Sequence, residues 1–300
     1  MPLQKPLWLT LAPALFLCLW SGGYVVAKVG ILYAEPMTLL ALRYFLVIAI
    51  MAALFVFLRP PLPQSPAEWG HLAMVGFLIQ SVYFGMCYLA FEAGIAAGTV
   101  ALLMSLQPVL VGLAAPGWTG ETIGWRRWTG LVLGLVGAVI VILVRSEIAT
   151  PSTLGLVCAV LGLIGITSGS LWEKRFGLSH HPVTANLVGF TAGLVGIVPF
   201  MLWRETMQIN WTVEFTIALA YLVIGNSVIA TGLLLAMIRA GDVSRVSALF
   251  FLVPPLAALL GWLVLDEIMP VLAWAGMALA ALGVFLATRS SAGAPVAKDV

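Results

Sequence analysis

Charged residues are scarce in this chain. Asp, Glu, Lys and Arg together make up 9% of its 300 residues, whereas hydrophobic residues make up 62%. Soluble domains carry roughly 25% charged residues, so this composition excludes one and indicates a chain whose solvent is the lipid bilayer. The net charge of +2 therefore gives no reason to expect nucleic acid as a partner.

Reactive groups are equally sparse. The three cysteines, Cys18, Cys87 and Cys158, show neither paired nor metal-ligand spacing, so we expect packed thiols and no disulfide. The three histidines fall near the ends of apolar runs, and no Ser or Cys nucleophile has an identifiable base at its depth. A phosphate-binding loop of the Walker type is missing too. We expect no enzymatic activity, no metal, no cofactor and no direct use of ATP.

Acidic residues are missing from the middle of every apolar run. A carboxylate at that depth usually relays protons in coupled antiporters. Facilitated passage down a gradient is therefore the simpler expectation for any transport by this chain.

The chain is rich in apolar runs of membrane-spanning length. The first is too long for the core of a signal peptide, and we expect it to stay as a span. Nine of the ten runs lack Asp, Glu, Lys and Arg, and the exception is Arg43 in the second. We expect an all-α polytopic membrane protein with ten transmembrane helices, at about residues 7–27, 36–58, 69–91, 96–117, 128–144, 153–172, 182–203, 215–238, 246–265 and 268–288.

Basic residues lie mainly on the side of the membrane that holds the N-terminus. On that side stand ten: Lys5, Arg59, Arg126, Arg127, Lys174, Arg175, Arg239, Arg245, Arg289 and Lys298. The opposite side holds three: Lys28, Arg145 and Arg204. The positive-inside rule then predicts that both termini are cytoplasmic.

The second half of the chain repeats the first with an offset of 146 residues. Pairs related in this way include Pro36 and Pro182, Thr38 and Thr184, Glu68 and Glu214, Pro108 and Pro254, Glu121 and Glu267, and Gly137 and Gly283. We expect one five-helix repeat over residues 1–147, a second over 148–289, and a disordered cytoplasmic tail over 290–300. Five spans are an odd number, so the second repeat must be inverted in the membrane, as in many transporters.

Prolines occupy related places in the two repeats. Pro108 lies in the fourth expected span and Pro254 in the ninth, and each removes a backbone donor from its helix. Paired breaks in inverted repeats point to hinges beside a substrate path, although a kink needed only for packing would look the same.

Polar uncharged residues follow the same symmetry, since Gln80 maps onto Asn226. Carboxamides avoid lipid, so these two and Gln107 should point inward, either toward a ligand or into helix-to-helix hydrogen bonds. Gln80, Tyr83, Phe84 and Cys87 share one face by helical spacing. Trp20 and Tyr24 could line a cavity or simply pack. The candidate substrate-binding residues are Trp20, Tyr24, Gln80, Tyr83, Met104, Gln107, Ser168, Trp172, Asn226, Ser247 and Phe250.

Arg43 lies about two turns inside the second expected span. It could hold a substrate carboxylate. It could equally extend to the outer interface or pair with Glu92 or Glu35, which are structural roles. The fifth and tenth spans lack acidic, basic and amide groups, so we assign them either to the scaffold or to the surface of a homodimer.

Three short stretches of the sequence are similar to segments of a known protein family. Leu19 to Lys28, Ala96 to Pro108, and Asp266 with Glu267 before a Gly-rich last span resemble the EamA-type permeases of the drug/metabolite transporter superfamily. Within it, the chain looks most like the bacterial YddG-type amino-acid exporters. The resemblance implies an inner-membrane protein with a central cavity, where Trp20 and Tyr24 stand at cavity positions and Pro108 and Pro254 at hinges. Small four-helix relatives carry an essential acid in their first span, and this chain has none there.

The sequence is therefore interpreted as an inner-membrane exporter of small metabolites, chiefly neutral and aromatic amino acids, which works by alternating access. Its expected partners are this small-molecule substrate and the surrounding membrane lipids. An exporter of hydrophobic drugs is the alternative within transport, because the same apolar cavity would serve. A membrane sensor or helper subunit that transports nothing is the alternative from another class.

Overall fold

Helices make up nearly all of the computed structural model, which describes residues 7–114, 125–146, 152–176, 180–239 and 252–289. The first half contains α1 (Leu7–Gly30), α2 (Pro36–Leu58), α3 (Pro66–Gly76), the π-helix η1 (Phe77–Phe84), α4 (Gly85–Glu92), α5 (Ala97–Met104), α6 (Gln107–Ala114) and α8 (Trp125–Ser146). The second half contains α9 (Thr153–Phe176), α10 (Pro182–Arg204), α11 (Val213–Ala220), the π-helix η2 (Tyr221–Ala230), α12 (Thr231–Arg239), α14 (Val253–Leu265) and α15 (Val271–Arg289).

The apolar runs form the expected spans. Within the described ranges, six helical stretches are long and apolar enough to cross a bilayer, and four shorter apolar helices accompany them. Local signals set several helix starts: Pro36 and Pro182 occupy first turns, where a missing N–H costs nothing. Ser65 Oγ accepts a hydrogen bond from the Glu68 N–H and so caps α3. The prediction of an all-α, two-repeat membrane fold is confirmed.

Helix boundaries follow the 146-residue offset of the sequence. α1 and α9 start and end at positions related by it, and so do α2 and α10. The π-helical stretches η1 and η2 also end at related positions, Phe84 and Ala230. A π-turn is rare, so its recurrence at the same place in both halves is strong evidence for a duplicated structure.

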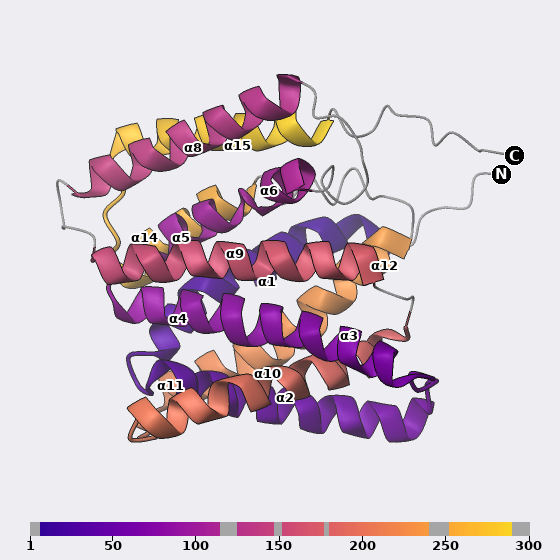
Figure 1. The fold of residues 1–300 in the computed structure, drawn as a ribbon. Coiled ribbons are helices and arrows are strands. Elements are labelled where there is room, and N and C mark those ends of the chain that lie inside the picture. Colours follow the sequence, from indigo (N-terminus) through magenta and orange to yellow (C-terminus); the bar gives the residue numbers. More distant parts are fainter. Residues whose placement is uncertain (1–6, 115–124, 147–151, 177–179, 240–251, 290–300) are drawn as a thin grey trace, which may run out of the picture.

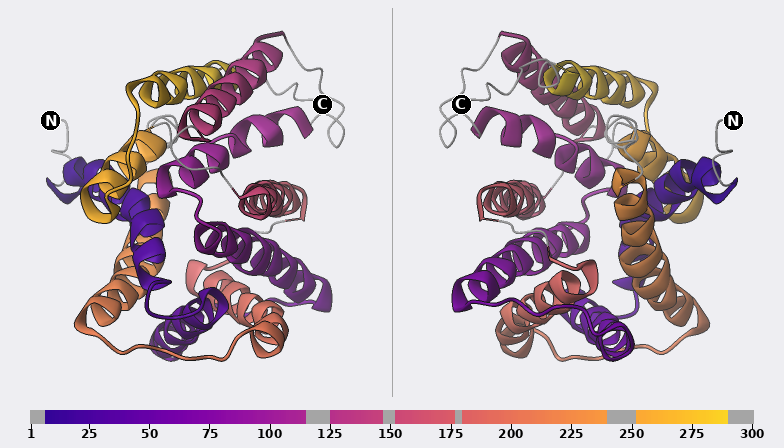
Figure 2. Two further views of the ribbon diagram at one scale, coloured as in Figure 1. Left: turned by 90° about the vertical axis from the view of Figure 1, so that its left-hand side faces the viewer. Right: turned by 90° about the vertical axis from the view of Figure 1, so that its right-hand side faces the viewer.

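Each half packs against the other through equivalent helices. α1 packs against η2 and α14, while its counterpart α9 packs against η1 and α6. Counterparts also contact one another directly, α2 with α10 and α8 with α15. Figure 1 shows α8 and α15 side by side at one edge of the bundle, with α2, α10 and α11 at the opposite edge. The end-on views of Figure 2 place α1 and α9 between these edges.

The fourth expected span is broken where a bend was predicted. α5 ends at Met104, a turn covers Ser105 and Leu106, and α6 starts at Gln107. Pro108 thus lies in the first turn of α6, and Pro254 likewise lies in the first turn of α14. Both prolines start helices because their missing N–H and fixed φ suit a first turn.

Connections at the predicted outer side tie the halves together. The buried Glu205 carboxylate accepts hydrogen bonds from the backbone N–H groups of Met37 (2.8 Å) and Thr38 (2.7 Å), and so caps α2 from the end of α10. Glu35 Oε2 accepts from the N–H groups of Thr206 and Met207, both at 2.8 Å. Because each carboxylate satisfies backbone donors from the other half, the two connections hold one another in place.

Candidate functional site

Arg43 is a buried cation at the centre of the bundle, with 2% of its surface exposed. Its Nε donates to Ser227 Oγ (3.0 Å), Nη1 to Tyr88 OH (3.2 Å) and Nη2 to Asn226 Oδ1 (2.9 Å). The guanidinium also lies 5.0 Å from the centroid of the Phe84 ring. Every one of these groups is neutral. Burying a charge without a counter-ion is costly, and the described residues that bind Arg43 supply none.

The structural alternatives for Arg43 are wrong. It does not extend to the interface, because its side chain is enclosed by the helices. The proposed acidic partners are engaged elsewhere: Glu92 Oε2 accepts from Arg204 Nη1 at 2.9 Å, and Glu35 binds the backbone after Glu205. Among the described residues, Arg43 thus contacts only hydroxyl, amide and aromatic groups. The sequence alone did not distinguish this arrangement from an ordinary ion pair.

Comparison of the two halves explains why space exists for an arginine. The position equivalent to Arg43 in α10 is Gly189, which lies so close to Gly76 of α3 that a Cβ on Gly76 would strike the backbone of Gly189. Gly193 and Gly196 continue this stripe against η1. In α2 the equivalent positions carry Arg43, Val47 and Ile50. One half therefore brings two helices into backbone contact, and the other half inserts a guanidinium in the same place.

Asn226 connects three helices around this arginine. While its Oδ1 accepts from Arg43, its Nδ2 donates to the Leu19 carbonyl of α1 at 3.2 Å. The amide reaches α1 because Gly23 has no side chain there, and a Cβ on Gly23 would collide with it. The Gly-rich stretch of α1 thus serves a contact with the candidate site, a role that its sequence alone does not reveal.

Two small cavities share three aromatic residues, and one of them is bordered by Arg43. The first has a volume of about 20 Å³ and is bordered by Arg43, Phe84, Phe91 and Asn226. The second, of about 50 Å³, reaches inward to residues of α5, α6 and α14. Trp20, Tyr24 and Tyr83 border both, and the hydroxyls of Tyr24 and Tyr83 are hydrogen-bonded at 3.1 Å. A water needs roughly 10–15 Å³, so this conformation is nearly closed and an amino acid requires helices to move apart.

Most predicted site residues gather around these cavities. Their linings include Trp20, Tyr24, Tyr83, Met104, Gln107 and Asn226 together with Arg43. Gln107 Nε2 also donates to Ser170 Oγ of α9 at 2.7 Å, so it connects two helices as well. Ser247 and Phe250 lie outside the described residues.

Three predicted residues lie elsewhere. Gln80 packs against Gly193 of α10, away from the cavities. It lies in η1, and the wider π-turn displaces it from the face that α-helical spacing assigned to it with Tyr83. Trp172 contacts the rings of His71 and Phe176, and Ser168 borders neither cavity. The spacing rule was wrong for Gln80 because it assumed a regular α-helix.

An ion pair joins three helix ends near the predicted outer side. Lys28 Nζ at the end of α1 lies 2.6 Å from Glu267 Oε1 and donates to the Ile95 carbonyl at 3.1 Å. Glu267 Oε1 also accepts from the Ala97 N–H at the start of α5 (3.3 Å). These contacts hold α1, α5 and the end of α14 together directly beside the cavity residue Ala27. The part of the chain that the structure describes contains no cluster of metal ligands.

A duplicated bundle of apolar helices, with polar groups gathered at its centre, defines a membrane transporter. The chain belongs to the EamA-like transporter family, whose model matches it twice, over residues 6–143 and 153–289. Members of this family are membrane transporters and not enzymes, so the prediction of no catalytic activity is confirmed.

Several relatives resemble the chain over most of its length. It is 22% identical to the uncharacterized transporter YvbV of Bacillus subtilis, covering 93% of this chain and 90% of the relative. It is 24% identical to a probable amino-acid metabolite efflux pump of Escherichia coli, covering 91% and 92%. For the uncharacterized inner membrane transporter YedA of Escherichia coli, the identity is 25% and the coverage 90% and 87%. A solved crystal structure shares the fold, with a TM-score of 0.63, 19% identity, and coverage of 94% and 96%.

Proposed function

We propose that this transporter exports small metabolites, chiefly neutral and aromatic amino acids, across a bacterial inner membrane. The two repeats are inverted with respect to each other, both termini are cytoplasmic, and the protein works by alternating access. The family to which the chain belongs supports this proposal. So do its relatives, which include an inner membrane transporter and a probable amino-acid metabolite efflux pump.

The observation that carries the proposal is the buried guanidinium of Arg43, which has only neutral partners beside a central cavity. A substrate carboxylate would supply the missing negative charge, and charge-assisted hydrogen bonds to it are the strong ones. The aromatic residues Trp20, Phe84 and Phe91 would contact an apolar side chain. A lipophilic drug cation would instead be repelled by Arg43, which makes the drug exporter the weaker alternative.

Counterflow of labelled phenylalanine into liposomes tests the proposal. We expect Arg43→Gln to lower this counterflow about 10- to 100-fold, since a charged hydrogen bond contributes roughly 1.5–3 kcal/mol. The matched control is Arg204→Gln, which removes a half-exposed arginine paired with Glu92 and should retain transport. Size-exclusion profiles and melting temperatures show whether each variant is folded.

A substrate analogue sharpens the result. Phenylalanine amide lacks the carboxylate, so unlabelled amide should compete poorly with phenylalanine in the wild type. Competition by lipophilic cations but not by free amino acids would contradict the proposal, as would full counterflow by a folded Arg43→Gln variant. Purified protein that moves no solute at all would indicate a sensor or helper subunit.

A further inference from the structure

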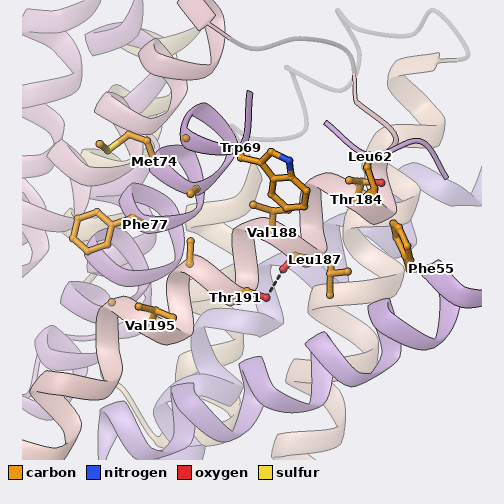
Figure 3. A pocket seen from close by; sticks show the side chains of 14 residues that line it. Phe55, Leu62, Trp69, Met74, Phe77, Thr184, Leu187, Val188, Thr191 and Val195 are labelled. Carbon is orange, nitrogen blue, oxygen red and sulfur yellow. Dashed lines mark hydrogen bonds between the residues drawn. The ribbon is translucent and has the colours of Figure 1, made fainter. Parts of the chain in front are cut away.

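A long apolar groove lies on the outer surface of the bundle, separate from the central cavities. It has a volume of about 660 Å³ and runs between α3 and α10 (Figure 3). Phe55, Leu62 and Thr184 gather at one end, and Phe77 and Val195 lie toward the other. Its walls belong to three of the stretches that are apolar and long enough to cross a bilayer. In the membrane the groove therefore opens to lipid and not to water.

Small residues form this groove. Gly70 and Ala73 on α3 and Ala192 and Gly196 on α10 line it, and the space beside Gly70 is empty for at least 4 Å. Bulkier neighbours, Trp69 and Phe77 among them, stand at its sides, each about 40% exposed. The equivalent positions in the other half carry larger residues, Thr216, Leu219, Leu46 and Ile50. The groove thus follows from the local sequence and not from the duplicated fold.

The length of the groove matches one leaflet of a bilayer. It runs along α10 from Thr184 to Gly196, which at 1.5 Å per residue is about 18 Å. Half of the hydrocarbon core is about 15 Å thick. Thr184 lies in the first turn of α10 and Leu62 follows α2, so one end of the groove starts at the membrane interface and the other lies near the bilayer centre.

Two hydroxyls line the groove: Thr184 lies at the interfacial end, and Thr191 farther along donates to the Leu187 carbonyl of its own helix. Arg59, one turn beyond Phe55, is exposed at the interfacial end, and the indole of Trp69 suits the headgroup region. A basic side chain at this level complements a lipid phosphate. We propose that the groove binds one phospholipid of the leaflet on this side, with an acyl chain lying between α3 and α10 and its phosphate beside Arg59.

Filling the groove tests the proposal. Gly70→Leu places a side chain in empty space, so the protein should still fold. After purification from membranes of phosphatidylethanolamine and phosphatidylglycerol, native mass spectrometry should find one phospholipid fewer on Gly70→Leu than on the wild type. The matched control is Gly232→Leu on α12, another exposed glycine with empty space beside it, which should retain the wild-type number. Equal lipid numbers on the wild type and on Gly70→Leu would overturn the proposal.

A second measurement uses the wild type alone. A phospholipid with a photoreactive acyl chain should label α3 and α10 more than the exposed face of α8 around Val132, Leu135 and Val139. Even labelling of the two surfaces would overturn the proposal. So would displacement of the lipid by free phenylalanine, which would make the groove a substrate entrance, or a dimer that Gly70→Leu abolishes, which would make it an interface between copies.

Discussion

At the scale of single residues, position beside a cavity distinguishes the polar side chains of the proposed site from those that pack between helices. Arg43 and Asn226 border a cavity and use their polar atoms there, whereas Gln80 faces a neighbouring helix. Among the described residues, Gln80 Oε1 is buried and accepts no hydrogen bond. An unsatisfied buried acceptor costs free energy, so this amide weakens the fold where it stands.

Two substitutions separate these roles. Gln80→Met keeps the side-chain volume and removes the unsatisfied acceptor, so we expect an equal or higher melting temperature and unchanged substrate preference. A loss of transport in the folded Gln80→Met variant would return Gln80 to the substrate path.

Trp20→Phe, which changes the wall of both cavities, should alter the relative counterflow of tryptophan, phenylalanine and leucine by several fold at unchanged abundance.

At the scale of elements, the irregular helices are the parts that differ from a simple bundle. Two π-helices, the break between α5 and α6, and the proline start of α14 all lie around the central cavities. Irregular turns leave backbone groups that can change partners at low cost. We therefore expect them to move more readily than the packed pairs α2 with α10 and α8 with α15.

The prolines remain the predicted hinges. Replacing both Pro108 and Pro254 with Ala would allow each following helix to extend backward, because alanine restores the missing N–H. We expect counterflow to fall severalfold while the melting temperature stays the same or rises. The single variants serve as controls, since two related hinges should each contribute. Unchanged transport by the folded double variant would assign the prolines to packing.

At the scale of the whole molecule, duplication makes alternating access mechanically reasonable. If both halves can adopt the same two shapes, exchanging those shapes converts an outward opening into an inward one. Here the predicted outer side is held together by Lys28 with Glu267 and by Glu205 at the start of α2. Under the proposed alternating access, opening to that side would require breaking the Lys28 ion pair, which joins α1 to two helices beside the cavity.

Cysteine labelling tests the inverted arrangement directly. Gln64 and Asn210 are exposed residues of connecting segments and are related by the 146-residue offset. In a background without Cys18, Cys87 and Cys158, an impermeant maleimide should label Asn210→Cys on intact cells. Gln64→Cys should react only after permeabilisation. Labelling of both cysteines from the same side would exclude inverted repeats. Labelling of Gln64→Cys on intact cells, with Asn210→Cys protected, would place both termini outside.

The sequence by itself determined the membrane location, the helical class and the duplication. Apolar runs, proline starts and a constant offset depend on composition and chain position, so they need no tertiary contacts to be recognised. Helix boundaries such as those of α2 and α10 were predicted almost to the residue for this reason.

Only the tertiary structure decided which polar side chains meet. Arg43 finds Ser227, 184 positions away, because α2 and η2 pack across the two halves. The π-turn that displaces Gln80 and the glycines that bring α10 against η1 act through three-dimensional packing. Sequence spacing describes neighbours within one regular helix, whereas this site is built between helices from opposite halves of the chain.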